Sequence, residues 1–316
     1  MRVAVIFPGQ GSQTLGMGAD VAAKSEIAAE LFERAKRVLG YDLLALQING
    51  PEEKLRETVY SQPAIFVTNL ALALACGDAL NPVVSAGHSF GEFCSLTLAG
   101  ALEFEDALRI VDERGKAMQA AAEQAPGAMS AVLGLEPSIL RETVERVRTT
   151  SNLRVQLANF NAPGQIVISG DLGGVQQAGQ ALLEAGAKRV VALNVSGAWH
   201  SELMQPAVER FGKAVEAGSF SLPRFDVISN VDATVYRDTA TMRSNLVHSL
   251  TAEVRWHDTA LEMMKHQPDL IVEFGASPVL GPMAKRLPEV KDVRTVSDYA
   301  GVEKLLTQLI AGAVNA

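Results

Sequence analysis

The residue best suited to chemistry in this chain is Ser89, within the segment Gly87-His88-Ser89-Phe90-Gly91. The segment fits the pattern G-x-S-x-G, in which a sharp turn between a strand and a helix lifts the serine hydroxyl out of the backbone. The flanking residues predict that setting, with a strand over Pro82–Ala86 and a helix over Glu92–Leu98. An ordinary glycine-rich turn would also fit the five residues alone. The strand before and the helix after favour a nucleophile, because the helix N-terminus would direct its positive dipole end at the hydroxyl.

A nucleophilic serine needs a base, and histidine is the usual one. The chain offers five: His88, His200, His248, His257 and His266. His200 follows a predicted strand, in a loop of small residues that leads into a helix, and such loops present catalytic groups in sheet proteins. We therefore expect His200 to be the base, the alternative being a histidine near a helix cap. No acidic third partner is evident, and a backbone carbonyl could orient the imidazole instead.

Two further polar residues could complete a site for acyl transfer. Gln10 is flanked by glycines after the first predicted strand, where its amide could donate to an oxyanion, and a plain turn is the alternative. Its segment is not a phosphate-binding loop, because no lysine follows the glycines. Arg114 lies on a predicted helix. A guanidinium turned into a cleft binds a carboxylate through two parallel bonds, whereas most helix arginines are solvated.

The elements that must position these residues alternate between strands and helices. Strands are predicted over Val3–Phe7, Pro82–Ala86, Val190–Asn194, Asp226–Ser229 and Leu270–Phe274. Helices are predicted over Ser25–Leu39, Ala64–Asp78, Phe104–Ala122, Met204–Ala217, Thr241–Leu250, Trp256–Lys265 and Gly301–Ala311. This alternation predicts an α/β fold with a mainly parallel sheet and helices on both faces.

A different rhythm runs from Ala128 to Asn194. The predicted order there is strand, helix, strand, strand, helix, strand, which is typical of a ferredoxin-like unit. We expect it to form a small subdomain over residues 127–195, inserted into a larger catalytic domain of residues 1–126 and 196–316. A cleft between the two would be the binding site.

The composition sets limits on the function. Of 316 residues, 48% are hydrophobic and 20% charged, so a large core is available. The net charge of −8 disfavours non-specific binding of nucleic acid. There is no apolar run of the roughly 18 residues that a membrane helix needs, and no signal-peptide pattern. The two cysteines, Cys76 and Cys94, lie in apolar segments that predict buried, reduced thiols and a cytoplasmic protein. No metal-ligand spacing is present.

Several motifs, taken together and in order, resemble the malonyl-CoA:acyl carrier protein transacylase family of bacterial fatty acid synthesis. They are Phe7-Pro8-Gly9-Gln10-Gly11-Ser12-Gln13, Ser61-Gln62-Pro63-Ala64, Gly87-His88-Ser89-Phe90-Gly91-Glu92, Arg114-Gly115 with Met118, Asn161 to Gly170, Ser196-Gly197-Ala198-Trp199-His200-Ser201 and Val254-Arg255-Trp256. The resemblance covers essentially the whole chain. It implies a hydrolase-like core with a ferredoxin-like insertion, and transfer of a malonyl group from malonyl-CoA to the phosphopantetheine thiol of acyl carrier protein.

The resemblance also implies residue roles. Ser89 matches the acyl-accepting nucleophile and His200 its base. Gln10 and the backbone N–H of Phe90 match the oxyanion hole, and Arg114 matches the residue that holds the malonyl carboxylate. The main-chain carbonyl that orients the histidine falls at Ser249. Gln62 and Gln165 match residues near the pocket, and Trp199 matches the aromatic residue that goes with malonyl donors.

This sequence departs from the family at a few positions. Ser249 replaces the usual Gln, and Ala252-Glu253 replaces Asn-Pro or Ser-Pro, which leaves the geometry of the orienting carbonyl open. Phe90 stands where Leu is common.

The substrate would be a CoA thioester, with no bound cofactor, and the chain is expected to be a monomer. Because acyl carrier proteins are generally acidic, docking needs a basic patch, for which Lys188-Arg189 and Lys285-Arg286 are candidates against scattered solvated charges. The alternatives are an acyltransferase of a polyketide synthase or malonate decarboxylase system, a serine esterase or thioesterase, and a non-catalytic carrier-binding module.

Overall fold

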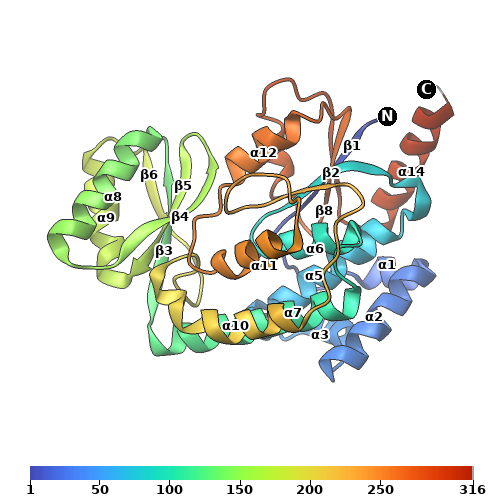
Figure 1. The fold of residues 1–316 in the computed structure, drawn as a ribbon, viewed down its shortest axis with the longest axis horizontal. Coiled ribbons are helices and arrows are strands. Elements are labelled where there is room, and N and C mark those ends of the chain that lie inside the picture. Colours follow the sequence, from blue (N-terminus) through green and yellow to red (C-terminus); the bar gives the residue numbers. More distant parts are fainter. Residues whose placement is uncertain (315–316) are drawn as a thin grey trace.

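Two β-sheets organise the chain in a computed structural model that describes residues 1–314 (Figure 1). The first sheet is parallel throughout, with strand order β7-β2-β1-β8-β9. Its strands are β1 (Val3–Phe7), β2 (Pro82–Gly87), β7 (Asp226–Ile228), β8 (Leu270–Phe274) and β9 (Val293–Val296). The predicted α/β class with a parallel sheet is confirmed.

The centre of this sheet is buried on both faces. Every residue of β1 and β8 is buried, as expected for parallel strands covered by helices on both sides. Side chains of a strand alternate between faces, and in β1 the residues Val3, Val5 and Phe7 join one apolar cluster while Ala4 and Ile6 join another. The carboxyl ends of the strands are thereby held at one rigid edge.

The helices of the larger part cover both faces of the parallel sheet. They are α1 (Ala19–Lys24), α2 (Glu26–Leu39), α3 (Leu43–Asn49), α4 (Glu52–Arg56), α5 (Thr58–Leu74), α6 (Gly91–Leu98), α7 (Phe104–Gln124), α10 (Gln205–Ala217), α11 (Thr239–His248), α12 (Trp256–Met264), α13 (Gly281–Ala284) and α14 (Tyr299–Val314), with 3₁₀ turns η1 (Gly77–Ala79) and η2 (Glu202–Met204). Helices α7 and α10 run side by side below the sheet in Figure 1. None of the described helices is long and apolar enough to span a membrane.

The second sheet is antiparallel, with strand order β4-β5-β3-β6, and lies at the left of Figure 1. It consists of β3 (Gly127–Leu133), β4 (Val155–Ala162), β5 (Gln165–Asp171) and β6 (Arg189–Ala192), with α8 (Pro137–Ser151) and α9 (Leu172–Glu184). The helices and strands enclose a core of their own. This is the order and topology of a ferredoxin-like unit. The predicted boundaries after residues 126 and 195 fall just outside β3 and β6, and the division into two domains stays a prediction.

Several elements differ from the sequence prediction, and two of them, α5 and β9, have a clear physical reason. Helix α5 begins at Thr58 rather than Ala64 and continues through Pro63. A proline inside a helix removes a backbone hydrogen bond, so the turn before Pro63 needs support from its surroundings. The earlier turn is held because it packs closely on α7, where a Cβ added at Gly115 would lie 2.9 Å from the Thr58 carbonyl oxygen. The short edge strand β9 has the polar residues Arg294 and Thr295 at its centre and gave no hydrophobic signal.

Candidate active site

The nucleophile turn joins β2 to α6 at the carboxyl edge of the parallel sheet, as predicted. Ser89 adopts a left-handed conformation with φ of 54°. The flanking glycines are required by close packing of the backbone: a Cβ on Gly87 would lie 1.9 Å from the carbonyl carbon of Gly91, and one on Gly91 would lie 2.5 Å from the Phe7 carbonyl oxygen. The turn therefore projects the Ser89 hydroxyl from a rigid support.

His200 lies against this hydroxyl. The distance from Ser89 Oγ to His200 Nε2 is 2.8 Å, and from His200 Nδ1 to the Ser249 carbonyl oxygen it is also 2.8 Å. A carbonyl oxygen can only accept, so Nδ1 carries the proton and Nε2 is free to accept from the serine. Burial, and then the nearby Arg114 cation, lower the pKa of His200 to about 3. The imidazole is thus neutral near pH 7, as a general base must be.

Arg114 completes the group around the hydroxyl. It is 1% exposed on α7; its Nη2 donates to Ser89 Oγ at 3.2 Å and its Nη1 to Gln62 Oε1 at 3.0 Å. Among the described residues, its Nε has no hydrogen-bond partner. Burial lowers the pKa of the guanidinium to about 9, opposed by the negative charge of Glu92. A buried cation with an unused donor is suited to receiving a carboxylate.

The site opens into a cleft of about 670 Å³. The small subdomain contributes Met129, Asn159 and the segment after β6, and the large part contributes Gln10 and Arg56. Among the other residues that line it are Ser89, Arg114, Met118, Trp199 and His200. The predicted cleft between the two sheets is therefore present, and the dyad lies in it.

The oxyanion-hole candidates, Gln10 and Phe90, follow strands β1 and β2. The side-chain amide of Gln10 donates one of its two hydrogens to Thr58 Oγ1 at 3.1 Å, and Gln10 lines the cleft, so its second N–H stays a candidate donor. The backbone N–H groups of Gln10 and Phe90 donate to no acceptor within residues 1–314. These two main-chain donors are available in addition to the side-chain amide of Gln10, whose part in the oxyanion hole stays a prediction.

Of the other predicted residues, Trp199 lines the cleft, whereas Gln62 and Gln165 do not. Gln62 is buried, accepts from Arg114, and donates to Met118 Sδ at 3.5 Å, so it orients the guanidinium rather than lining the cleft. Trp199 lines the cleft beside His200 and is 5% exposed. Gln165 begins β5, opposite Leu133 and Ala162, and is not among the residues that line the cleft, so its predicted place near the pocket stays a prediction.

A buried network behind the nucleophile was not foreseen. Asn230 Oδ1 accepts from the Ser89 N–H at 2.7 Å, and its Nδ2 donates to the Gly87 carbonyl at 2.7 Å. The Asn230 N–H donates to Glu92 Oε2 at 3.1 Å, and the Tyr236 hydroxyl donates to Glu92 Oε1. Burial raises the pKa of Glu92 to about 7. Asn230 follows β7, and its position at a strand end was the signal that could have revealed it.

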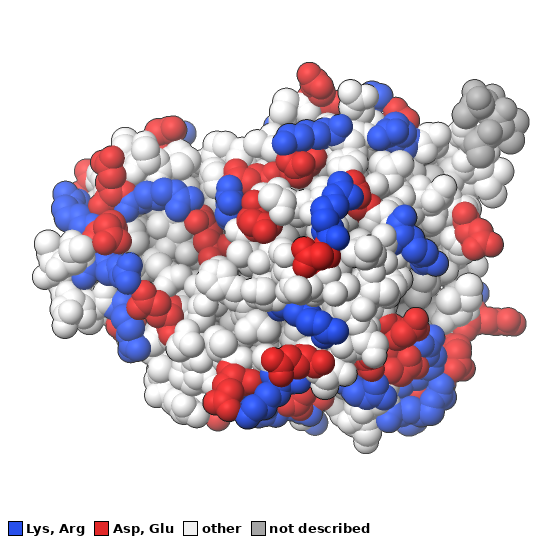
Figure 2. All heavy atoms as spheres, in the orientation of Figure 1, with Lys and Arg blue, Asp and Glu red and all other residues white. Residues whose placement is uncertain are grey.

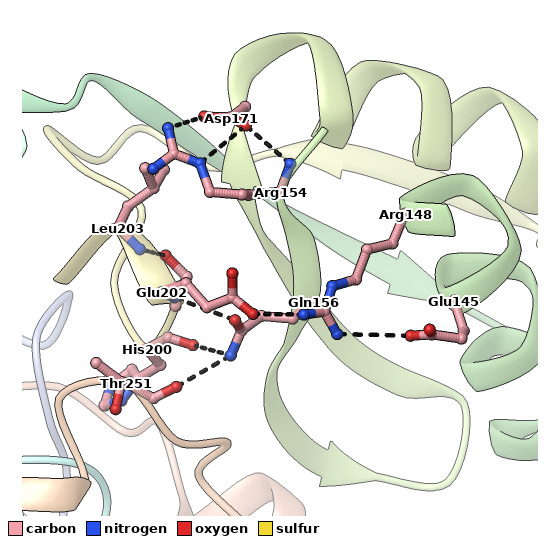
Figure 3. A network of polar contacts seen from close by, with 10 residues as sticks. Glu145, Arg148, Arg154, Gln156, Asp171, His200, Glu202, Leu203 and Thr251 are labelled. Atoms are coloured by element: carbon pink, nitrogen blue, oxygen red, sulfur yellow. Dashed lines mark hydrogen bonds and ion pairs between the residues drawn. The ribbon is translucent and has the colours of Figure 1, made fainter. Parts of the chain in front are cut away.

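The remaining candidates for chemistry are an acidic partner for the histidine, a metal site and the two cysteines. Asp171, an acidic residue at the end of β5, pairs with Arg154 at 2.8 Å and lies away from His200, so it does not act as the third member of a triad (Figure 3). Within the described part of the chain, no group of three or more His, Cys, Asp or Glu residues is arranged to hold a metal ion. Cys76 and Cys94 are both free and buried, as predicted.

Residues 4–304 match the sequence model of the family described as "Acyl transferase domain". The chain belongs to the acyl transferase family. Within it, the chain is 39% identical over 309 residues to the malonyl CoA-acyl carrier protein transacylase of Escherichia coli, covering 96% of this chain and 99% of that one. This acyl transferase thus has full-length relatives in the group that its motifs resemble.

Two solved structures are similar to this chain in fold and in sequence over nearly their whole length. An acyl carrier protein S-malonyltransferase from Vibrio cholerae has a TM-score of 0.92 and 36% identity, covering 96% of this chain and 100% of that one. A malonyl-transacylase solved in complex with a type II PKS acyl-carrier protein has a TM-score of 0.93 and 36% identity, covering 98% and 100%.

Proposed function

We propose that this acyltransferase moves a malonyl group from malonyl-CoA to the phosphopantetheine thiol of acyl carrier protein in fatty acid synthesis, through a malonyl ester on Ser89. The observation that carries the proposal is the position of one hydroxyl between a neutral imidazole and a buried guanidinium. The first activates the oxygen, and the second selects a donor with a free carboxylate.

In the first half-reaction, His200 Nε2 takes the proton of Ser89 as Oγ attacks the thioester carbonyl. The backbone N–H groups of Gln10 and Phe90 stabilise the negative oxygen that develops. When the tetrahedral intermediate collapses, the carbon–sulfur bond breaks and His200 returns its proton to the departing CoA thiolate. The Ser249 carbonyl holds the imidazolium in the orientation needed for both proton transfers.

In the second half-reaction, His200 takes the proton of the carrier thiol, whose sulfur attacks the malonyl ester. The carbon–oxygen bond breaks and Ser89 recovers its proton. The CoA thioester is a substrate, and the scheme needs no bound cofactor, because every proton and bond is accounted for by the two thiols, Ser89 and His200.

Arg114 gives the donor preference a physical reason. An acetyl group would leave the buried guanidinium without a carboxylate partner, and a buried unpaired donor is costly. Orientation by Gln62 keeps the guanidinium pointed at the hydroxyl. Trp199 narrows the cleft beside His200, in keeping with an unbranched malonyl group.

The partner is expected to dock on basic residues of a chain whose net charge is −8. Lys188, Arg189, Lys285 and Arg286 are all exposed and are candidates. Figure 2 shows Lys and Arg interspersed with Asp and Glu on the face it displays, so any docking patch there is local. We further propose a monomer that acts in the cytoplasm.

The test is intact-protein mass after incubation with a panel of acyl-CoA donors, with and without carrier protein. We expect malonyl addition to the wild type, none to Ser89→Ala, and a preference in Arg114→Ala shifted from malonyl toward acetyl. Malonylation of Ser89→Ala would refute the nucleophile, and an unchanged preference would refute the role of Arg114. Rapid hydrolysis without carrier protein would favour a thioesterase instead.

A further inference from the structure

Gln156 on β4 of the small subdomain joins the two segments that hold the catalytic histidine (Figure 3). Its Nε2 donates to the His200 carbonyl at 3.2 Å and to the Thr251 carbonyl at 3.0 Å. Its Oε1 accepts from the Glu202 N–H at 3.1 Å. Both amide hydrogens and one oxygen lone pair are thus used, and all three partners are main-chain groups.

These main-chain groups define the position of the imidazole. His200 is a non-glycine residue with φ of 57°, a conformation that needs external support. Thr251 lies two residues after Ser249, whose carbonyl accepts from His200 Nδ1. A single amide therefore fixes both the backbone that carries the imidazole and the turn that orients it.

The turn after Ser249 is anchored on the same strand. The Val254 N–H donates to the Ala158 carbonyl at 2.8 Å, and the Phe160 N–H donates to the Val254 carbonyl at 2.9 Å. From α8, Arg141 forms a two-pronged ion pair with Glu253, with both distances 3.0 Å. The small subdomain thus holds residues 251–254 at several points, and Gln156 is the contact that also reaches His200.

We propose that Gln156 is a positioning residue for the general base: it keeps His200 Nε2 directed at Ser89 without touching the substrate. The inference rests on the function proposed above. The chemistry is specific to a primary amide of this length, because among uncharged side chains only Gln and Asn offer two donors and an acceptor in one plane, and Asn is one methylene shorter. Proton transfer is sensitive to small displacements, so loss of the clamp should slow acylation.

Two substitutions separate the contacts. Gln156→Met removes all three bonds at similar volume, whereas Gln156→Glu keeps an acceptor for the Glu202 N–H and loses the two donors. Single-turnover malonylation of Ser89, followed by intact mass, should slow about ten- to a hundredfold in both variants. The malonyl-CoA concentration for half-maximal rate should stay unchanged, because Arg114 and the cleft are untouched. Wild-type rates in both, or a loss confined to Gln156→Met, would overturn the proposal.

A double-mutant cycle distinguishes positioning from general stability. If Gln156 acts through the imidazole, Gln156→Met should slow residual acylation less than about twofold when His200 is already replaced by alanine. A loss that multiplies in the His200→Ala background would show a merely structural role and overturn the proposal. Should Gln156→Met fail to fold, Gln156→Asn, which has the same groups on a shorter side chain, takes its place in the cycle.

The control is Gln177→Met, an exposed position on α9 of the same subdomain, which should acylate like the wild type. A wild type that acquires no malonyl group would contradict the proposed function rather than the role of Gln156. A malonylated wild type with unaffected Gln156 variants would contradict only the inference.

Discussion

Lowering the pH from about 8 to about 5 should leave the rate of Ser89 malonylation nearly unchanged. Burial, followed by the charge of Arg114, lowers the pKa of His200 to about 3. At about pH 5 such a group is only about 1% protonated, so nearly every molecule retains its base. An ordinary histidine, with a pKa of about 6.5, would be about 97% protonated and the rate would fall about thirtyfold.

The assay is single-turnover malonylation, quenched at short times and read as intact mass, at a series of pH values. The buried Glu92 beside the nucleophile turn also titrates in this range, because burial raises its pKa to about 7. Glu92→Gln removes that ionisation and serves as the matched variant. A step near pH 7 that disappears in Glu92→Gln belongs to Glu92. A thirtyfold fall with a midpoint near 6.5 in both proteins would refute the reasoning about His200.

The pKa values of His200 and Glu92 predict opposite effects of pH on the free energy of unfolding. His200 binds a proton less readily when folded, so its contribution to the free energy of unfolding should decrease as the pH falls from about 6.5 toward 3. Glu92 binds a proton more readily when folded, so its contribution should decrease as the pH rises from about 4.5 to 7. Denaturant unfolding of Glu92→Gln and the wild type across this range measures the second effect directly.

Two further outcomes are expected. Ser249→Ala should acylate like the wild type, because the Ser249 carbonyl makes the contact to His200 Nδ1 while the Ser249 hydroxyl donates to the Leu246 carbonyl. Single-turnover rates of malonylation check this expectation. A hundredfold loss, comparable to the loss of a general base, would contradict it. Asn230→Ala leaves the Ser89 N–H and the Gly87 carbonyl without their buried partner. The free energy of unfolding should therefore fall by about 2–4 kcal/mol. Denaturant unfolding midpoints measure this loss, and an unchanged midpoint would contradict the prediction.

The sequence predicted the residues that meet at the nucleophile better than those that support them. Ser89 lies in a turn motif, His200 in a loop after a predicted strand and Arg114 on a predicted helix. The fold brings the three side chains together. Asn230 was missed because its role depends on β7 lying beside β2, a neighbour relation that no local pattern encodes. Gln156 was missed for a similar reason, since its partners lie 44 or more residues away along the chain.

Side-chain direction set another limit. Gln10 was located correctly at the end of β1, but only the packing of α5 shows that its amide turns to Thr58. Gln165 resembles a pocket residue in sequence, yet at the start of β5, opposite Leu133, it is not among the residues that line the cleft. In both cases the local sequence predicts a loop or a strand and leaves the orientation to tertiary contacts.

The two reacting residues share a strained, left-handed backbone conformation. Ser89 and His200 have φ of 54° and 57°, where glycine would be at ease and most other residues cost about 1–3 kcal/mol each. Domains of this kind keep only about 5–15 kcal/mol of net stability. Glycine at either position would relieve this strain and increase the stability of the fold, but it would remove a reacting side chain. At these two positions, selection for stability therefore opposes selection for catalytic activity.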